Sequence, residues 1–137
     1  MLNYRDNIVF LLAKAHQHAQ GCLKGELKAF GLTPVQCLLL ESLWEEEGLA
    51  VGEIGRRLVL DTATLAGVLE RMVSAGWVRR ETDAEDARVA RVYLSDKARE
   101  VTAELEVAIA RANNEALEGF SLEEKLLFKR FLREFKS

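Results

Sequence analysis

Residues 51–95 decide the fold and read VGEIGRRLVLDTATLAGVLERMVSAGWVRRETDAEDARVARVYLS. Apolar residues recur at helical spacing in residues 51–58 and again in residues 62–75, with only a tight turn between the two segments. Residues 77–82 and 89–94 are strand-like, and the polar loop between them marks a hairpin. A helix, a tight turn, a second helix and a hairpin in this order predict a winged helix-turn-helix. The predicted fold class is therefore mainly α with a small β-hairpin.

The chain upstream of this stretch predicts two further helices. The first spans about residues 4–30, where a glycine stops it, and its apolar residues follow a spacing that lines one face. The second begins after Thr33, because Thr33 and Gln36 form a capping box and Pro34 suits the first helical turn. The apolar face of the first helix consists of Ile8, Leu12, Ala15, Ala19 and Cys22.

The chain downstream of the hairpin predicts two more helices. Ser95 caps one long helix, and Ser121 starts a second capping box and a last helix rich in leucine and phenylalanine. The first and last helices carry more apolar surface than a winged helix can cover, and such surface usually becomes a subunit interface. We therefore interpret residues 1–137 as a single domain with a winged-helix lobe at 33–95 and dimerisation helices at 1–31 and 96–137.

The composition is that of an ordinary globular protein, with 49% hydrophobic and 30% charged residues. The longest early apolar run, residues 8–13, is far too short to span a bilayer, and no cleavage site of a secretory signal follows it. Two cysteines do not make a disulfide scaffold. We expect a cytoplasmic protein without a membrane partner.

Arginine is concentrated in the middle of the chain, although the formal net charge of the whole is −3. Residues 51–100 hold eight of the twelve arginines and one lysine against nine acids, so this segment is neutral overall. Salt screening confines the field of a surface charge to about 8–10 Å, so a local arginine-rich surface can bind DNA without a positive total charge. The charge distribution therefore permits DNA binding.

Residues 32–96 resemble the MarR family, the multiple-antibiotic-resistance type of bacterial transcriptional regulators. The likeness rests on LTPVQCLLLESL, then VGEIGRRLVLDTATLAGVLERMVSAGWVRR, then DAEDARVARVYLSDKARE. The last piece holds the D-x-R wing signature of the family as Asp86-Ala87-Arg88, followed by the hydrophobic–Leu–Ser/Thr ending of the wing as Tyr93-Leu94-Ser95. The resemblance implies a dimeric winged-helix repressor or activator. We interpret the chain as a homodimer that binds double-stranded DNA at a pseudo-palindromic operator, as a repressor that a small-molecule effector releases.

The resemblance also implies which residues contact DNA. The helix of residues 62–75 enters the major groove, and Arg88 at the hairpin tip enters the flanking minor groove, where Asp86 holds it by a charge-assisted hydrogen bond. Helical periodicity supports the first role, because the apolar residues of this helix share its opposite face. The residues of this helix that we expect to face DNA are Thr62, Thr64, Gly67 and Arg71.

The remaining arginines of this region are open to other interpretations. Arg56 and Arg57, on the first helix of the pair, either contact DNA phosphate or only solvate that helix. The strand arginines are expected to set the local potential or to pair with Glu81 and Asp83 rather than to read bases; they are Arg79, Arg80 and Arg91.

The cysteines and histidines do not form an evident site. Cys22 and Cys37 are either small buried apolar side chains or a redox switch, which would need a thiolate near a cation or a helix N-terminus. Within the family, the chain looks closest to the organic-hydroperoxide-resistance regulators, but Val9-Phe10-Leu11-Leu12 stands where those carry a reactive cysteine. His16 and His18 point to different faces of a helix, so we expect no metal site.

The sequence contains no pattern typical of an enzyme, such as a nucleophile with its base, a phosphate-binding glycine loop or paired carboxylates. We therefore expect a DNA-binding regulator without a cofactor, whose effector is a small aromatic or anionic molecule or an oxidant. Two alternatives remain: a thiol-based redox regulator acting through Cys22 or Cys37, and a winged-helix module that docks a protein. DNA binding should weaken steeply with salt, whereas docking of a protein should not.

Overall fold

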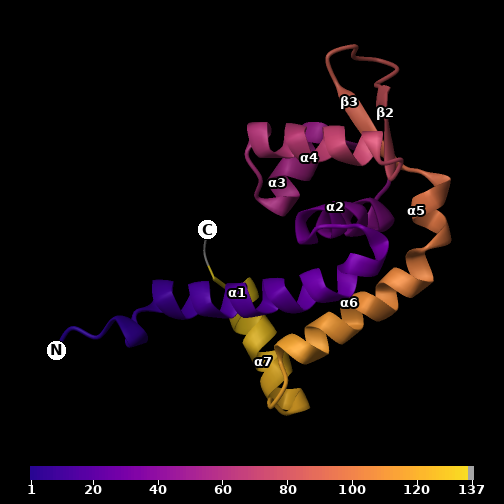
Figure 1. The fold of residues 1–137 in the computed structure, drawn as a ribbon. Coiled ribbons are helices and arrows are strands. Elements are labelled where there is room, and N and C mark those ends of the chain that lie inside the picture. The colour runs from indigo at the N-terminus through magenta and orange to yellow at the C-terminus, as the bar shows by residue number, and fades with distance from the viewer. Residues whose placement is uncertain (136–137) are drawn as a thin grey trace. The chain divides into compact units, whose positions relative to one another are not determined.

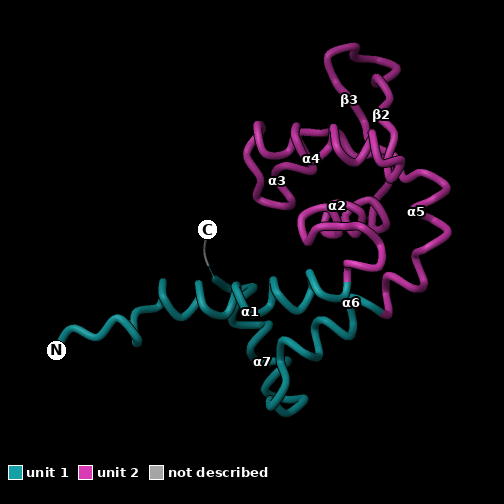
Figure 2. The backbone as a smooth tube through the Cα atoms, in the orientation of Figure 1, with its two compact units in different colours: residues 1–26, 108–137 teal, residues 27–107 magenta. Residues whose placement is uncertain are grey.

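The computed structural model describes residues 1–135. The mainly helical architecture with a small sheet confirms the predicted fold class, and the chain divides into two compact units, residues 27–107 and residues 1–26 with the chain from 108 onward (Figure 2). The elements are η1 (Tyr4–Asp6), α1 (Ile8–Leu27), η2 (Lys28–Phe30), α2 (Pro34–Glu45), β1 (Leu49–Ala50), α3 (Val51–Leu58), α4 (Thr62–Ser74), β2 (Val78–Thr82), β3 (Ala90–Leu94), α5 (Asp96–Glu100), α6 (Thr102–Ala116) and α7 (Leu122–Arg133), where η is a 3-10 helix (Figure 1).

In the unit of residues 27–107, the start of α2 follows the predicted capping box. The Thr33 hydroxyl accepts a hydrogen bond from the Gln36 backbone N–H at 3.2 Å, and the Gln36 side chain accepts one from the Thr33 N–H at 3.0 Å. Pro34 occupies the first turn, where its missing N–H has no helical partner to lose. Local sequence chemistry alone therefore sets the beginning of this helix.

The helices α3 and α4 are joined by a tight link, as predicted. α3 ends at Leu58, and the next residue, Val59, has a φ of 55°, in the left-handed region that valine rarely adopts. Asp61 then caps α4, because its carboxylate accepts the backbone N–H of Thr64 at 2.8 Å. Gly55 allows the two helices to approach closely: a Cβ there would lie 3.3 Å from the backbone oxygen of Leu60 and equally near a side-chain carbon of α4.

The sheet has three antiparallel strands in the order β1-β3-β2. β2 and β3 form the predicted hairpin, with Val78 opposite Leu94. β1, which pairs Leu49 with Val92, is a strand that the sequence did not predict, because two residues are too few to show alternation. It anchors β3 to the chain segment between α2 and α3.

The core of this unit is formed by the apolar faces that helical and strand periodicity predict. Helices α2, α3 and α4 and strand β3 contribute side chains that are at most 5% exposed. These side chains are Leu39, Leu40 and Leu43 of α2, Ile54 of α3, Leu65, Leu69 and Met72 of α4, and Val92 and Leu94 of β3. The same burial leaves the opposite face of α4 free.

The prediction of one long helix after Ser95 is wrong, because the helix breaks at Val101 into α5 and α6. The Thr102 hydroxyl donates to the backbone oxygens of Ala98 and Arg99 at 3.2 and 3.0 Å, so a side chain helps to satisfy the carbonyl groups at the break. α5 lies beside β3 and belongs to the unit of residues 27–107.

The other unit contains most of α1, the end of α6, and α7. Cys22, Ala108 and Ala112 are buried in it, but the described residues of α7 include none that is buried. The unit therefore shows the surplus of apolar surface that the sequence predicted on its helices. Its exposed large apolar side chains include Ile8, Val9 and Leu11 of α1 and Leu122, Leu126, Leu127, Phe131 and Leu132 of α7. No helix within residues 1–135 is both long enough and apolar enough to cross a membrane.

Candidate nucleic-acid interface

α4 presents two faces of opposite character. Leu65, Leu69 and Met72 are at most 2% exposed and fix the helix on the core. The residues expected to face DNA lie away from that core: Thr62, Thr64 and Arg71 are exposed, and Gly67 is half-buried. A shallow depression lies on this outward face, lined by Gly67, Glu70, Arg71, Ser74 and Ala75.

Gly67 has no role in the packing of its own unit. A Cβ built at this position meets no atom within 4 Å, so the protein itself does not require a glycine there. A glycine in the middle of a helix costs stability relative to alanine. The absence of a side chain at Gly67 leaves this part of the outward face of α4 open.

Thr64 and Thr62 differ in how free their side chains are. The Thr64 hydroxyl donates to the carboxylate of Asp61 at 3.0 Å, in addition to the capping bond from its N–H. These hydrogen bonds hold the pKa of Asp61 below its usual range. Thr64 therefore helps to order the first turn of α4, and Thr62 is the exposed threonine at the start of the helix.

The hairpin of β2 and β3 carries Arg88 in its loop, and the arginine side chain is 91% exposed. Its Nε donates to Asp86 Oδ1 at 3.1 Å, and its backbone N–H donates to the same oxygen at 3.0 Å. The side-chain bond from Arg88 is the largest influence that lowers the pKa of Asp86. The hairpin adjoins α4 through β2 and projects beyond it (Figure 1), so one unit holds both candidate contact elements.

The expected pairing of the strand arginines with acids is confirmed for two of them. Arg79 forms an ion pair with Glu81, and its guanidinium lies 4.7 Å from the centre of the Tyr93 ring. Arg91 donates to Asp83 at 2.6 Å. Arg80 is exposed on β2.

The two arginines of α3 are already engaged within the protein. Glu53 accepts hydrogen bonds from both Arg56 and Arg57, and Arg57 also pairs with Glu46. These bonds lower the pKa of Glu53 and raise that of Arg57. The Arg56 side chain is still 74% exposed, so it remains more accessible to an external phosphate than Arg57, which is 35% exposed.

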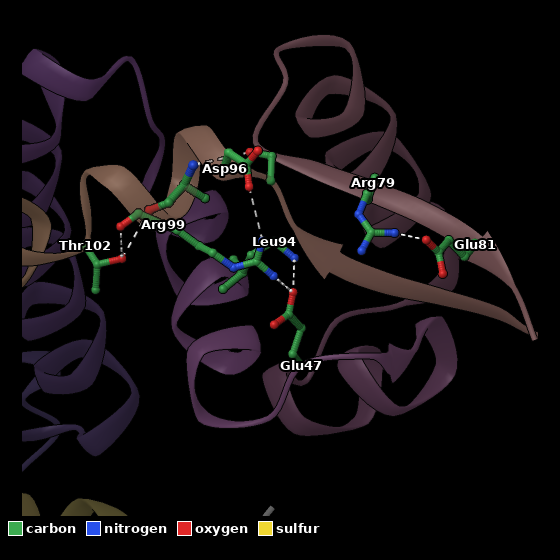
Figure 3. A network of polar contacts seen from close by, with 9 residues as sticks. Glu47, Arg79, Glu81, Leu94, Asp96, Arg99 and Thr102 are labelled. Atoms are coloured by element: carbon green, nitrogen blue, oxygen red, sulfur yellow. Dashed lines mark hydrogen bonds and ion pairs between the residues drawn. The ribbon is translucent and has the colours of Figure 1, made fainter.

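Two contacts of α5 were not predicted from the sequence, and both support the winged helix. Glu47 accepts the backbone N–H of Leu94 at 3.0 Å and pairs with Arg99, which ties the end of α2 to β3 and α5 (Figure 3). Lys97 donates to the backbone oxygen of Ala75 at 2.9 Å, which satisfies a carbonyl just beyond the C-terminus of α4. These partners are 22 to 52 residues apart, so no local sequence signal could have revealed them.

The cysteines lie in surroundings that oppose a thiolate. Cys37 is fully buried, and burial together with the neighbouring Glu41 raises the pKa of its thiol to about 12. Burial also raises the pKa of Cys22, with Glu115 adding to the effect; its sulfur lies 3.8 Å from His18 Nε2. A redox-sensing cysteine needs the opposite shift. Within residues 1–135, no group of three or more side chains is arranged to hold a metal ion.

Comparison with known proteins gives the same assignment as the geometry. The sequence model of the MarR family matches residues 32–90. The HTH-type transcriptional regulator TtmR of Methylorubrum extorquens is 52% identical over 68 residues, which are 50% of this chain but only 35% of that protein. The chain thus matches about a third of the length of this relative. The HTH-type transcriptional regulator MgrA of Staphylococcus aureus is 30% identical over 75% of this chain and 71% of its own.

Solved structures of similar proteins share the whole fold. A probable transcriptional regulator from Pseudomonas aeruginosa is 30% identical, with a TM-score of 0.90 over 96% of this chain and 98% of its own. The structure of reduced AbfR bound to DNA is 28% identical, with a TM-score of 0.77 over 95% of this chain and 89% of its own. These likenesses cover the flanking helices as well as the winged helix. The chain belongs to the MarR family of winged-helix transcriptional regulators, which are DNA-binding proteins and not enzymes.

Proposed function

We propose that this chain is a homodimeric repressor that binds a pseudo-palindromic operator and that a small aromatic or anionic molecule releases it. In this proposal α4 enters the major groove and the hairpin loop enters the flanking minor groove. The observation that carries the proposal is the outward face of α4, where an exposed Arg71 lies beside a glycine that the protein's own packing does not require. AbfR, a similar protein, has been solved bound to DNA.

The chemistry of the outward residues suits this role. The guanidinium of Arg71 can donate two parallel hydrogen bonds to guanine or phosphate, and Thr62 can contact a phosphate oxygen or a thymine methyl group. The narrow minor groove has a strongly negative potential, which favours an inserted arginine such as the exposed Arg88. Each contact places a side chain against the feature of DNA that its chemistry recognises.

The proposed dimer rests on the exposed apolar side chains of α1 and α7. Side chains such as Phe131 and Leu126 are 54% and 62% exposed, which is unfavourable in water unless another surface covers them. A second copy of the chain provides a matching apolar surface by symmetry. Two copies would also present two α4 helices to two half-sites, as a palindromic operator requires.

The proposal is tested by selecting duplexes from a random DNA pool and measuring affinity for the enriched sequence by fluorescence anisotropy. We expect an inverted repeat to be enriched and affinity to fall steeply with salt concentration. Arg71→Ala should weaken binding by roughly 1–3 kcal/mol. Arg111→Ala, which removes the same charge from an exposed position on α6, serves as the control and should bind nearly as the wild type does.

The same measurements separate the proposal from its alternatives. Selection without enrichment, or affinity that does not depend on salt, would favour a module that binds proteins. Release from DNA by hydroperoxide that Cys22→Ser or Cys37→Ser abolishes would favour a thiol switch. The raised pKa of both thiols supports the ligand-released repressor over that switch.

A further inference from the structure

The hairpin loop is held by a chain of polar contacts that starts outside the loop and ends at Arg88. From this geometry we infer that Arg91 and Asp83 are positioning residues for DNA binding: they fix the loop so that Arg88 is presented to the minor groove. The inference rests on the DNA-binding role proposed above. It adds two residues that do not themselves contact DNA.

Arg91 connects the hairpin to the segment before β1. Its Nε donates to Asp83 Oδ1 at 2.6 Å, and one terminal nitrogen donates to the backbone oxygen of Gly48 at 2.9 Å. Gly48 has a φ of 80°, and a Cβ there would lie only 3.1 Å from the Tyr93 ring, so this turn favours glycine. One planar guanidinium thus joins the start of the loop to a fixed point in the fold.

Asp83 passes this constraint into the loop backbone. Its Oδ2 accepts the backbone N–H groups of Glu85 and Asp86, both at 3.0 Å. The backbone N–H of Asp83 donates to the oxygen of Val89 at 2.8 Å, which closes the loop. The Asp83 side chain is only 19% exposed. Its carboxylate therefore fixes the turn that leads to Asp86.

Asp86 completes the chain at Arg88, through the bonds to the Arg88 backbone N–H and Nε described above. A second guanidinium nitrogen of Arg88 lies 3.3 Å from Asp86 Oδ2, which makes the contact two-pronged. Hydrogen bonds lower the pKa of both Asp83 and Asp86, so the two carboxylates are charged near neutral pH. The series of polar contacts from Gly48 to Arg88 is therefore unbroken, and both of its carboxylates are charged.

Fixing the loop matters because ordering a flexible side chain on binding opposes affinity. The Arg88 side chain is 91% exposed, so little packing holds it in place. Its direction is therefore limited mainly by its contacts with Asp86 and by the loop backbone. Lysine cannot replace Arg91 in this series of contacts, because a single ammonium lacks the planar guanidinium that donates to Asp83 and to the Gly48 oxygen with fixed geometry. An Arg91→Lys variant keeps the charge and loses the positioning, which separates the two effects.

The experiment measures DNA affinity by anisotropy for Arg91→Lys, Asp83→Asn and Arg88→Ala, and for Arg91→Lys combined with Arg88→Ala. Arg91→Lys should weaken binding about two- to 150-fold, the range that coupling between neighbouring residues covers. The slope of affinity against salt should not change, because no phosphate contact is lost. In the Arg88→Ala background, Arg91→Lys should have no further effect. Arg79→Lys is the matched control on β2. Arg79 contacts Glu81 and the Tyr93 ring but not the loop, so this variant should bind as the wild type does.

Two results would overturn the inference while leaving the proposed function intact. One is unchanged affinity of Arg91→Lys when Arg88→Ala weakens binding. The other is an Arg91→Lys effect that persists fully in the Arg88→Ala background, which would make Arg91 an independent contact. Unchanged affinity of Arg88→Ala itself would overturn the proposed minor-groove role as well as the inference. Circular dichroism of each variant establishes that it is folded.

Discussion

Gly67→Ala is expected to stabilise the protein and weaken its binding to DNA at the same time. The glycine lies in the interior of α4, and an added Cβ meets no protein atom within 4 Å. Alanine should therefore raise the free energy of unfolding by about 0.5–1 kcal/mol through backbone entropy alone. For a chain of this size, that change corresponds to an increase in Tm of about 2–4 °C.

The effect on DNA binding has the opposite sign because the new methyl group lies on the outward face of α4. If that face approaches the groove closely, the methyl group displaces the helix and weakens contacts that are each worth roughly 1–3 kcal/mol. We expect a loss of affinity of about tenfold or more. Thermal unfolding at a fixed protein concentration and anisotropy with the selected duplex measure the two effects.

Gly25→Ala provides the control for this pair of measurements. Gly25, like Gly67, is a glycine within a helix to which an added Cβ would meet nothing within 4 Å, but it lies on α1. It should give a similar gain in stability without a change in affinity. If Gly67→Ala binds DNA as tightly as the wild type, α4 does not approach the groove by this face. If Gly67→Ala lowers the Tm, the space around Gly67 is not free.

Three further predictions concern the cysteines, the acids of the hairpin and the apolar helices. Native Cys37, with a pKa of about 12, should resist iodoacetamide at pH 8 and react only after unfolding in urea, as mass spectrometry can measure; rapid alkylation of the native protein would contradict its burial. Asp83 has a lowered pKa in the folded state, so its contribution to stability is complete above its ordinary value of 3.8 and disappears as the pH falls through the folded value. The difference in urea stability between wild type and Asp83→Asn should thus be constant from pH 7 to pH 5 and shrink toward pH 3, and a difference that grows on acidification would refute this sign. Phe131→Glu should convert the proposed dimer to a monomer in analytical ultracentrifugation and reduce operator affinity with it, whereas Lys129→Glu, a charge change on the same helix, tests for a purely electrostatic effect.

The parts of the fold that the sequence predicted correctly have local causes. Thr33 and Ser121 each form a capping box with a residue three positions later, so a single helical turn of sequence specifies where α2 and α7 begin. The buried face of α4 follows in the same way from the helical spacing of Leu65, Leu69 and Met72.

The parts that were missed depend on residues far apart in the sequence or on very short elements. β1 has two residues, and only their pairing with Val92 and Arg91 on β3 makes it a strand. The break at Val101 interrupts a sequence whose apolar spacing continues across it, so periodicity could not reveal it.

The candidate site shows the same division. The outward residues of α4 follow from periodicity, and pairing with Glu81 and Asp83 was one of the two roles predicted from the sequence for the strand arginines. It could not predict that Arg91 reaches Gly48, because that contact spans 43 residues and requires the hairpin to lie against β1. The roles of these residues on DNA remain predictions.

A hydroxyl-radical footprint on the selected duplex tests the central claim most directly, namely that two copies of this chain read DNA through α4 and Arg88. We predict two symmetric protected half-sites whose centres are about 34 Å apart, each flanked by minor-groove protection that Arg88→Ala removes. A single protected region without symmetry, or protection that is unchanged by Arg88→Ala, would contradict the claim.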